Sequence, residues 1–297
     1  MKKEKFVKGM IIMIIGAIFC FSLVSIHQAH AINKIGVLAK RGAPKCMKKW
    51  GATGAYISKK LGEKFQIIPL KFVAIEPAVR SGRIDFLLAN PAFYVQLQRK
   101  YHLYAITTLI NSRRGKAVER FGGVIFTKKD SPINKLQDIK GKRFMCVKFS
   151  SFGGFHMAYR LLLENGIDPK RDCRLIEGGK HDNVVLAVKN GTVDIGTVRT
   201  DTLERMQDEG RISLSEFKII HKINDDFPFV HSTRLYPEWP FAALPDTDRG
   251  VVAKVKKALL SLPKESKAAN VAKIVGWTEP ADYSEVENCL RKIGIIK

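Results

Sequence analysis

The sequence predicts an α/β protein made of two similar lobes that are joined by two chain crossings. Short apolar runs alternate with helical patterns from residue 35 onward, and this alternation occurs twice along the chain. The two series also align in sequence, because Ala78–Phe86 matches Ala187–Ile195 at a constant offset of 109 residues. The alternative is a chance likeness of two common helix-to-strand turns, but the matching order of elements favours two related lobes.

The elements of the first series follow from local patterns. Apolar side chains three and four residues apart, from Met47 to Leu61, predict one face of a helix that Gly62 ends. Another helix has Pro91 in its first turn, where proline is well tolerated. A parallel sheet covered by helices on both faces is expected from strands at 35–38, 65–70, 84–89 and 103–110 and helices at 47–61, 76–81 and 91–99.

The second series repeats this order, with strands at 142–149, 173–177 and 193–198 and helices at 154–165, 181–189 and 200–207. An extended segment at 122–129 is expected to cross between the lobes, and the segment 225–244, rich in proline and aromatic residues, is expected to cross back. Helical patterns in the tail are expected to cover the first lobe. The predicted organisation is therefore 32–122 and 236–297 for the first lobe and 123–235 for the second lobe with its crossing segments. Two crossings form a hinge around a cleft, an architecture that closes on a ligand.

The first 31 residues have the pattern of a secretory signal peptide. Lysines at Lys2–Lys8 precede the apolar run Met10–Ile26, which is followed by Ala29-His30-Ala31. A basic start, an apolar stretch and an A-x-A site predict export and cleavage after Ala31. The alternative is an uncleaved N-terminal anchor, since the apolar run is long for a signal peptide. We therefore expect a periplasmic protein.

The charge balance predicts an anionic partner. The chain has 51 Lys and Arg against 28 Asp and Glu, a formal net charge of +23. Such an excess favours nucleic acid, an anionic membrane or a small anion. An exported chain does not meet nucleic acid, and no later apolar run is long enough to cross a bilayer. We expect a small anionic ligand and a monomeric protein.

No enzyme, metal or cofactor site is predicted. The chain lacks the G-x-S-x-G, H-E-x-x-H and G-x-x-x-x-G-K-[ST] patterns, and its histidines show no metal-ligand spacing. His156 is a poor candidate for a catalytic base because no orienting acid lies near it in sequence. An even number of cysteines after residue 31 permits disulfides, but we expect buried thiols at Cys46, Cys146, Cys173 and Cys289.

Ligands of open α/β sheets bind beyond the carboxyl ends of the parallel strands, near helix N-termini. The turn Phe149–Gly154 links a strand to a helix, and small residues there let backbone N–H groups approach an oxyanion. Asn90 ends a strand of the first lobe, and Arg199 occupies the matching place in the second lobe, 109 residues later. Lys40 and Arg41 add positive charge at the same rim. The predicted ligand-binding residues are Arg41, Asn90, Tyr94, Ser150, Ser151, Gly153, Gly154, Arg199 and Thr200.

Each of these residues also has an alternative interpretation without a ligand. Ser151 has the residue type of a helix N-cap, and Asn90 that of a turn residue before proline. Most arginines are solvated, and Arg199 could follow that rule. Tyr94 is expected to form an aromatic wall of the cleft together with Phe152, although both suit a core equally well. The ligand interpretation is favoured because all of these turns face one predicted cleft. In that interpretation the Arg199 guanidinium binds the ligand and is not part of the core.

Several segments together resemble periplasmic solute-binding proteins of the phosphate, phosphite and phosphonate type. The resemblance is carried, in this order, by Phe86–Val95, Phe121–Phe126, Leu136–Arg143 and Ser150–Phe155, and it covers residues 35 to 293. The segment His231–Pro240 is similar to one branch, the periplasmic sensing domains of tetrathionate-sensor-like histidine kinases. The resemblance implies a type II periplasmic-binding fold with a small oxyanion held between the lobes, either phosphate-like or a sulfur oxyanion. It also implies delivery to the permease of an ABC importer or, alternatively, presentation of the ligand to a separate membrane histidine kinase.

Overall fold

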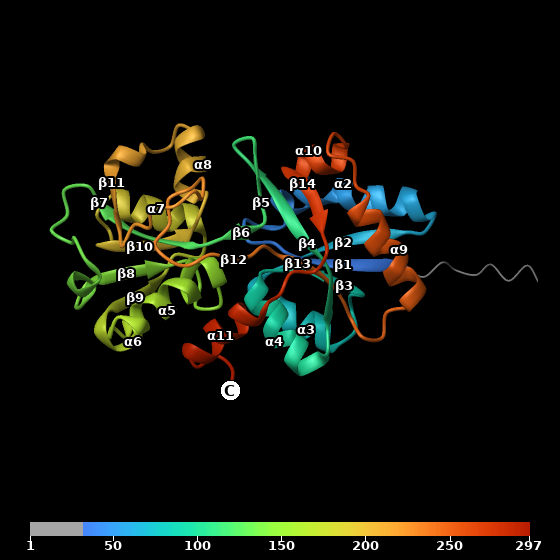
Figure 1. Cartoon of the computed structure of the whole chain (residues 1–297), viewed down its shortest axis with the longest axis horizontal. Coiled ribbons are helices and arrows are strands. Elements are labelled where there is room, and N and C mark those ends of the chain that lie inside the picture. The colour runs from blue at the N-terminus through green and yellow to red at the C-terminus, as the bar shows by residue number, and fades with distance from the viewer. Residues whose placement is uncertain (1–31) are drawn as a thin grey trace, which may run out of the picture. The chain divides into compact units, whose positions relative to one another are not determined.

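The computed structural model describes residues 32–297, which form one compact unit. The predicted signal peptide, residues 1–31, lies outside the described residues. Two separate sheets organise the unit, as Figure 1 shows with the smaller sheet on the left. We call the larger sheet with its helices the first lobe and the smaller one with its helices the second lobe. No helix within residues 32–297 is long and apolar enough to cross a membrane.

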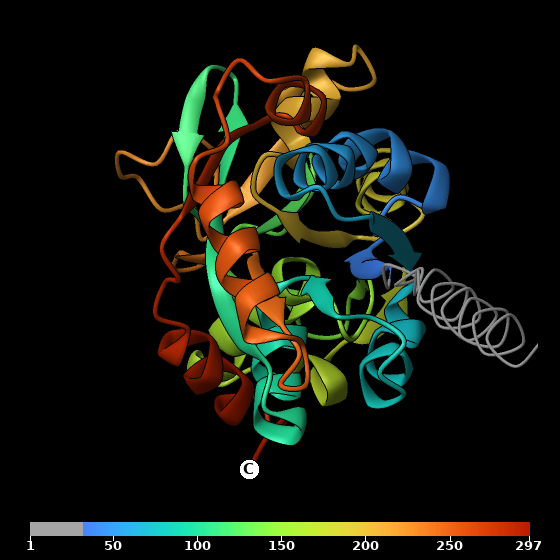
Figure 2. The same cartoon turned by 90° about the vertical axis from the view of Figure 1, so that its right-hand side faces the viewer.

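The first lobe is built on a seven-stranded sheet in the order β14-β4-β13-β3-β1-β2, with β5 paired to β4. Its helices α2, α9 and α10 pack together on one face, and α3, α4 and α11 lie on the other (Figures 1 and 2). One continuous apolar core joins these layers. The strands are β1 (Asn33–Leu38), β2 (Phe65–Leu70), β3 (Phe86–Leu88), β4 (Tyr104–Arg113), β5 (Lys116–Val118), β13 (Pro240–Ala243) and β14 (Ile274–Thr278). The helices are α2 (Ala43–Leu61), α3 (Ile75–Arg80), α4 (Pro91–Tyr101), α9 (Arg249–Leu260), α10 (Lys267–Ala272) and α11 (Ser284–Lys292).

The second lobe has a five-stranded sheet in the order β11-β7-β10-β8-β9, with an apolar core on each face. Side chains alternate along β7, since Val124 and Phe126 belong to one core and Ile125 to the other. The strands are β7 (Gly123–Lys128), β8 (Arg143–Cys146), β9 (Arg174–Glu177), β10 (Ile195–Arg199) and β11 (Phe217–Ile220). The helices are α5 (Met157–Glu164), α6 (Pro169–Asp172), α7 (His181–Lys189) and α8 (Thr202–Asp208).

The prediction of wholly parallel sheets is wrong for both lobes. Strands β1, β2 and β3 are parallel, as are β8, β9 and β10, but β13 runs antiparallel to β3 and β7 antiparallel to β10. Each of these antiparallel strands is the first one after a chain crossing. A strand that arrives from the other lobe enters the sheet from the cleft side, which reverses its direction.

The chain crossings are shorter than the sequence predicts. The segment 122–129 is not itself a crossing, because most of it is β7, a buried strand inside the second sheet. The crossing strands are β6 (Arg120–Phe121) and β12 (Tyr236–Pro237), which pair with each other between the lobes (Figure 1). Helix α11 packs against α4 of the first lobe and also contacts the second lobe, where Arg160 Nη1 donates to the Glu285 carbonyl at 3.4 Å.

Candidate functional site: a cationic cleft between the lobes

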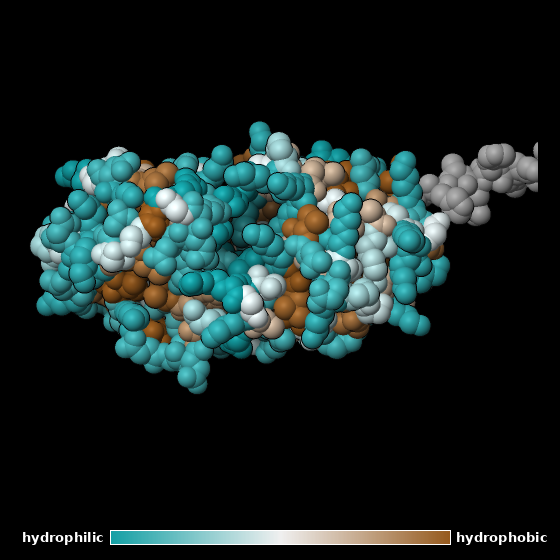
Figure 3. Space-filling view, turned by 90° about the horizontal axis from the view of Figure 1, so that it is seen from above, coloured by the Kyte–Doolittle hydropathy of each residue, from teal (hydrophilic) through white to brown (hydrophobic). Residues whose placement is uncertain are grey.

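A cavity of about 20 Å³ lies between the two lobes, at the carboxyl ends of their parallel strands. This volume holds about one water molecule. Seen from above, the surface is hollowed between the lobes, and hydrophilic residues gather around the hollow (Figure 3). Both lobes and both crossings line the cavity, through Leu38, Lys40, Phe72, Asn90, Phe121, Ser151, Phe152, Gly153, His181, Arg199 and Trp239.

The turn after β8 forms the second-lobe wall. Residues Phe152–His156 make a single π-helical turn, η3, that runs directly into α5, where the sequence predicts a plain helix from Gly154. The first N–H groups of a helical segment have no partner inside it, so those of residues 152–155 are available to an anion. Ser151 is only 5% exposed, lines the cavity and makes no capping hydrogen bond. Its side chain is therefore a buried polar group at the cavity that does not cap the helix.

Two glycines let this turn pack tightly against the rest of the site. A Cβ on Gly153 would lie 2.8 Å from the Phe121 ring and 2.9 Å from the Cβ of Arg199, closer than side chains tolerate. A Cβ on Gly154 would lie 2.5 Å from Val147. Gly153 lines the cavity, whereas Gly154 and the half-buried Ser150 do not. Of this turn, Ser151, Phe152 and Gly153 are the residues that border the cavity.

Arg199, at the end of β10, forms a buried ion pair. Its Nη2 lies 2.7 Å from Oε1 of Glu238, and the two side chains are 6% and 0% exposed. The guanidinium also lies over the Phe121 ring, 4.3 Å from the centroid. Arg199 lines the cavity, but it is neither solvated nor reserved for a ligand, because removing it would leave the buried Glu238 carboxylate unpaired. The expectation that Arg199 does not serve the core is therefore wrong.

A second arginine–carboxylate pair joins the lobes beside the first. Arg113, at the end of β4, pairs through Nε with Asp201, the residue that precedes α8. The pKa of Asp201 is lowered: burial alone would raise it, but Arg113 and Arg199 outweigh burial. Both carboxylates near the cavity, Asp201 and Glu238, are therefore already neutralised by arginine.

Two lysines of the first lobe add positive charge without a carboxylate of their own. The Nζ of Lys40 lies 5.2 Å from the Trp239 ring centroid, and that of Lys49, on α2, lies 4.8 Å from the Trp50 centroid. Neither has an ion pair among residues 32–297. We call these lysines and the two ion pairs the cleft charge cluster. It comprises four cations and two carboxylates: Lys40, Lys49, Arg113, Arg199, Asp201 and Glu238.

The pKa values of both lysines reflect this excess of cations. Burial, followed by the charges of Arg199 and Arg113, lowers the pKa of Lys40 to about 7, although Asp201 and Glu238 oppose the change. Burial, followed by Arg113, Lys40 and Arg199, also places the pKa of Lys49 well below its ordinary value. An anion in the cavity would relieve this repulsion. The cluster is thus electrostatically suited to hold negative charge.

His181, the first residue of α7, adds a neutral donor to the second-lobe wall. The backbone N–H of Arg199 donates to its Nδ1 at 3.3 Å, which leaves the proton of a neutral ring on Nε2. Burial, followed by the charges of Lys40 and Arg199, lowers the pKa of His181 well below its ordinary value. The ring therefore stays neutral and presents one N–H donor.

The other predicted residues have structural roles outside the cavity wall, with Asn90 as a mixed case. Asn90 lines the cavity and also caps α4, accepting from the Phe93 N–H at 3.2 Å. Tyr94 packs edge-on against Tyr283 and accepts from the Ala105 N–H at 3.1 Å, so it belongs to the core of the first lobe. Thr200 accepts from the Gly122 N–H at 3.3 Å and fastens β10 to the crossing. Neither Tyr94 nor Thr200 lines the cavity.

Arg41 belongs to a contact between the lobes at the cleft rim. Its Nη2 lies 3.0 Å from Asp182 of α7, a carboxylate that also pairs with Arg205 and Arg211 of its own lobe at 2.6 Å each. Burial opposes ionisation of Asp182, but Arg205, Arg211 and Arg41 outweigh it and lower its pKa to about 2. Arg41 therefore holds the lobes together and does not line the cavity.

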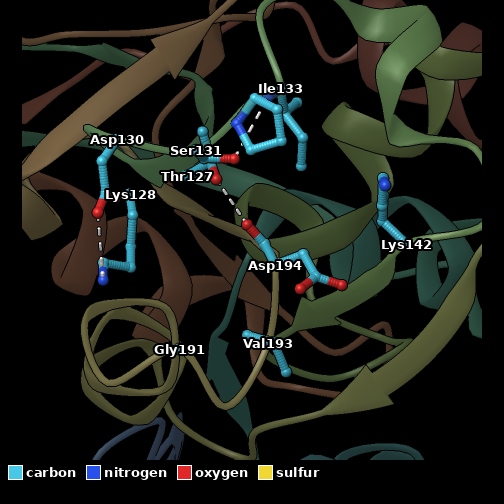
Figure 4. A pocket seen from close by; sticks show the side chains of 10 residues that line it. Thr127, Lys128, Asp130, Ser131, Ile133, Lys142, Gly191, Val193 and Asp194 are labelled. Carbon is cyan, nitrogen blue, oxygen red and sulfur yellow. Dashed lines mark hydrogen bonds and ion pairs between the residues drawn. The ribbon is translucent and has the colours of Figure 1, made fainter.

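A larger cavity of about 150 Å³ lies at the opposite end of the second sheet, and Figure 4 shows it. Most of its polar side chains have partners, although Lys142 has no ion pair among residues 32–297: Thr127 Oγ1 donates to the Asp194 carbonyl at 2.6 Å, and the Asp194 carboxylate pairs with Arg143. Lys128 lies 3.8 Å from Asp130. This cavity lies away from the carboxyl ends of the strands, so we do not assign it the ligand.

His156 does not have the surroundings of a catalytic base. It is 1% exposed, its Nε2 contacts the Phe149 carbonyl at 2.6 Å, and burial lowers its pKa to about 4. The four cysteines at 46, 146, 173 and 289 are free thiols, and burial raises the pKa of each.

Sequence reasoning missed Lys49, Arg113, His181 and Glu238. Lys49 directly precedes Trp50, a residue of the apolar face of its helix, and Arg113 ends an ordinary strand. Neither residue has a local sequence pattern that indicates a role in a site. Glu238 does carry one, because it is an acidic residue between prolines in an otherwise apolar and aromatic stretch, Tyr236–Ala243. A carboxylate in such a stretch indicates a buried ion pair.

Comparisons with known proteins agree with this architecture. The chain is 34% identical over 262 residues to a tetrathionate sensor histidine kinase of Salmonella typhimurium, covering 87% of this chain and 43% of that protein. It is 26% identical over 204 residues to a phosphonates-binding periplasmic protein of Escherichia coli, covering 66% and 58%. The chain thus spans about half the length of the curated relatives it matches.

A solved structure shows the same fold. The structure of PhnD1 from Prochlorococcus marinus in complex with methylphosphonate superimposes with a TM-score of 0.72 at 18% identity, covering 89% of this chain and 99% of that one. The fold is that of type II periplasmic binding proteins. The family model of the periplasmic substrate-binding protein of phosphonate ABC transporters matches residues 35–286. The chain therefore belongs to this family of periplasmic proteins, whose members bind a solute.

Proposed function

We propose that this protein binds a small oxyanion between its lobes, a phosphate- or phosphonate-like anion or a sulfur oxyanion. The observation that carries the proposal is the cleft charge cluster, in which four cations face two carboxylates that are already paired. A buried excess of positive charge without a ligand is unfavourable. An anion that neutralises it gains these interactions only when the lobes close.

The binding residues we propose come from both lobes. The N–H groups at 152–155, the Ser151 hydroxyl and the Arg199 guanidinium would hold the anion from the second lobe. Lys40 would hold it from the first lobe, and Asn90 and Trp239 would shape the cavity. These groups are donors or cations, as an oxyanion requires.

Two partners are supported by different observations. The family match supports delivery of the anion to the membrane permease of an ABC importer. The 34% identity to a tetrathionate sensor histidine kinase supports a second candidate, in which the protein presents its ligand to a separate membrane kinase. Deletion of the gene separates the two roles: loss of uptake of the anion indicates import, and loss of an anion-induced transcriptional response with normal uptake indicates sensing.

The binding step itself is tested by thermal unfolding with a panel of anions: phosphate, phosphite, methylphosphonate, sulfate, thiosulfate and tetrathionate. A ligand at a hundred times its Kd adds about 2.7 kcal/mol to the free energy of unfolding. We expect at least one of these anions to raise the Tm, and the association rate to fall as salt screens the cluster. A flat result across the panel would contradict the proposal.

A further inference from the structure

The net positive charge of the protein is concentrated in the first lobe. Residues 32–122 and 236–297, which include the first lobe, have 28 Lys and Arg against 12 Asp and Glu, whereas residues 123–235 have 19 against 15. The cleft charge cluster explains little of this excess, because it has only two more cations than carboxylates. Most of the excess therefore lies elsewhere on the first lobe.

One side of the first lobe carries the larger part of it. The segments 43–64 and 245–273, which contain α2, α9 and α10, have 13 Lys and Arg against 4 Asp and Glu. The segments 71–102 and 279–297, which contain α3, α4 and α11 on the opposite side of the sheet, have 8 against 6. We call the outer surface of α2, α9 and α10, which pack together in Figures 1 and 2, the basic face.

The cations of the basic face are mostly exposed and without carboxylate partners. Within residues 32–297, two of the 13 form an ion pair: Lys254 with Glu63 at 3.3 Å and Lys256 with Glu279 at 2.7 Å. Ten of the others are exposed side chains. Like charges gathered on one surface repel one another, so an extended anionic partner would be attracted to the whole face.

Exposed apolar side chains lie among these lysines. Leu260 is 37% exposed and follows Lys257 by one turn of α9, and Val271 is 38% exposed and follows Lys267 by one turn of α10. Lysines mixed with exposed apolar side chains suit the surface of a lipid bilayer, where ammonium groups meet phosphates and apolar side chains enter the acyl boundary. This combination favours a membrane over a wholly polar anionic partner.

The described chain starts at the edge of the basic face. The Asn33 N–H donates to the Lys64 carbonyl at 2.9 Å, and Asn33 Nδ2 donates to Glu63 at 3.3 Å. In the sequence, five residues separate Ile32 from the apolar run Met10–Ile26, which is at most about 20 Å of chain. As a signal peptide or as a retained anchor, that run would bring the edge of the basic face to the lipid headgroups.

We propose that the basic face docks on a bilayer that contains anionic phospholipids. Each lysine near such a surface contributes about fivefold to the affinity, and salt screens the attraction, so the contact is strong in sum and reversible. Every residue that lines the cavity between the lobes lies outside α2, α9 and α10, so the docked protein keeps its ligand site. The proposal does not depend on which anion the cleft binds.

Co-sedimentation with lipid vesicles tests the docking on residues 32–297, which form a compact unit without the apolar run. Vesicles of phosphatidylglycerol and phosphatidylcholine in equal parts should pellet the protein, and vesicles of phosphatidylcholine alone should not. Pelleting should weaken as salt rises to the physiological concentration. Free glycerol phosphate, the soluble form of the same anionic group, should not compete, because only a surface engages many lysines at once.

Two triple variants with the same change in net charge give the matched comparison. The first changes exposed lysines of the basic face and should weaken vesicle binding about a hundredfold. Its substitutions are Lys59→Gln, Lys257→Gln and Lys267→Gln. The control changes exposed lysines of the second lobe and should weaken binding by no more than about threefold, because those charges lie away from the bilayer. Its substitutions are Lys129→Gln, Lys140→Gln and Lys222→Gln. Both variants should keep the Tm of the unchanged protein.

The outcomes separate this docking from the proposed function. If the phosphatidylglycerol vesicles do not pellet the protein at low salt, membrane docking is overturned, and an acidic protein becomes the partner that fits the basic face. Equal losses in the two triple variants would also overturn it, since net charge and not this face would then drive binding. If the vesicles bind as expected but no anion of the panel raises the Tm, the docking stands and the proposed function fails.

Discussion

The two lobes have the same scaffold and differ at its carboxyl edge. The strand order β2-β1-β3-β13-β4 of the first lobe corresponds to β9-β8-β10-β7-β11 of the second. The Asp85 carboxylate accepts the Lys34 N–H at 2.6 Å, and its counterpart Asp194 accepts the Arg143 N–H at 2.8 Å. The same hydrogen bond from a strand backbone to an aspartate is therefore present in both lobes.

The turn after the equivalent strands β1 and β8 shows the difference. In the first lobe this turn carries Lys40 and Arg41, whose charges sit on flexible side chains. In the second lobe it carries Ser151–Gly154, where the donors are backbone N–H groups fixed by the helix. One wall is therefore rigid and insensitive to pH, and the other is adaptable and titrates.

The largest expected effect concerns Arg199, the second-lobe position equivalent to Asn90. Arg199→Ala should lower the free energy of unfolding by about 3–5 kcal/mol, because it leaves the buried Glu238 carboxylate without its ion-pair partner. Urea denaturation measures this change. The double variant Arg199→Met, Glu238→Leu should recover most of the stability but not anion binding. A loss under about 1 kcal/mol in the single variant would contradict the buried pair.

Alanine substitutions of two glycines, one in the helical segment after β8 and one in α2 after β1, should change stability in opposite directions. Gly153→Ala forces a Cβ within 2.9 Å of both Phe121 and Arg199, so we expect a loss of about 1–3 kcal/mol in stability and weaker anion binding. In α2 of the first lobe, a Cβ on Gly51 meets nothing within 4 Å. Gly51→Ala should therefore gain up to about 1 kcal/mol through helix propensity. Thermal unfolding of the two variants gives the comparison, and equal effects would refute it.

The adaptable wall should make binding depend on pH. With the pKa of Lys40 near 7 in the free protein, an anion that raises this pKa must bring a proton with it above pH 7. Affinity should be highest below pH 7 and fall by up to about tenfold per pH unit above it. The charged groups that act on Lys40 are Arg199, Arg113, Asp201 and Glu238. Besides burial, the charge of Lys40 in turn lowers the pKa values of Lys49 and His181, which makes these two the neighbouring groups that respond to its charge.

Calorimetry in buffers with different ionisation enthalpies measures the proton uptake. Lys40→Gln should remove most of the dependence, and an unchanged pH profile in that variant would assign the proton to another group, with Lys49 as the first alternative.

A smaller effect is expected from the cap of α4. Asn90→Ala removes the acceptor of the Phe93 N–H and should cost about 1 kcal/mol of stability. Asn90→Ser retains a capping oxygen and should recover most of it. If both variants lose anion affinity while Asn90→Ser keeps full stability, Asn90 contacts the ligand as well as the helix.

The smallest effect is expected at the rim. Arg41→Gln removes a partly exposed ion pair between the lobes and should weaken anion binding by no more than about fivefold, the equivalent of about 1 kcal/mol. Lys45→Gln, an exposed position in the same helix start, serves as the control. A loss above about a hundredfold would mean that Arg41 touches the ligand.

Local patterns in the sequence predict most of the scaffold. In each lobe a helix ends at a glycine with a positive φ, Gly82 or Gly191, and an aspartate, Asp85 or Asp194, follows three residues later. This turn depends on neighbouring residues only. The turn at Ser151–Gly153 and the positions of Asn90 and Arg199 follow from the rule that ligands bind where strands end. Tyr94 shows the limit, because periodicity does not tell which apolar side chain of a helix faces a core and which faces a cleft.

The pairing of charges across the cleft could not be predicted from the sequence. Arg199 and Glu238 are 39 residues apart, and they meet only because a returning crossing passes the end of β10. Arg113 and Asp201 are on different lobes and meet across the cleft. Such pairs depend on how the two lobes fit together, which no local pattern encodes.

The three arginines around Asp182 bear on how quickly a captured ligand can leave. Opening the cleft separates Asp182 from Arg41 but not from Arg205 and Arg211, so the carboxylate keeps two partners and is never stranded. A partly exposed pair of this kind is expected to slow opening by no more than about fivefold. The Arg41–Asp182 pair therefore adds little to the residence time of a bound ligand, which depends on the contacts of the ligand itself and on the second ion pair between the lobes, Arg113 with Asp201.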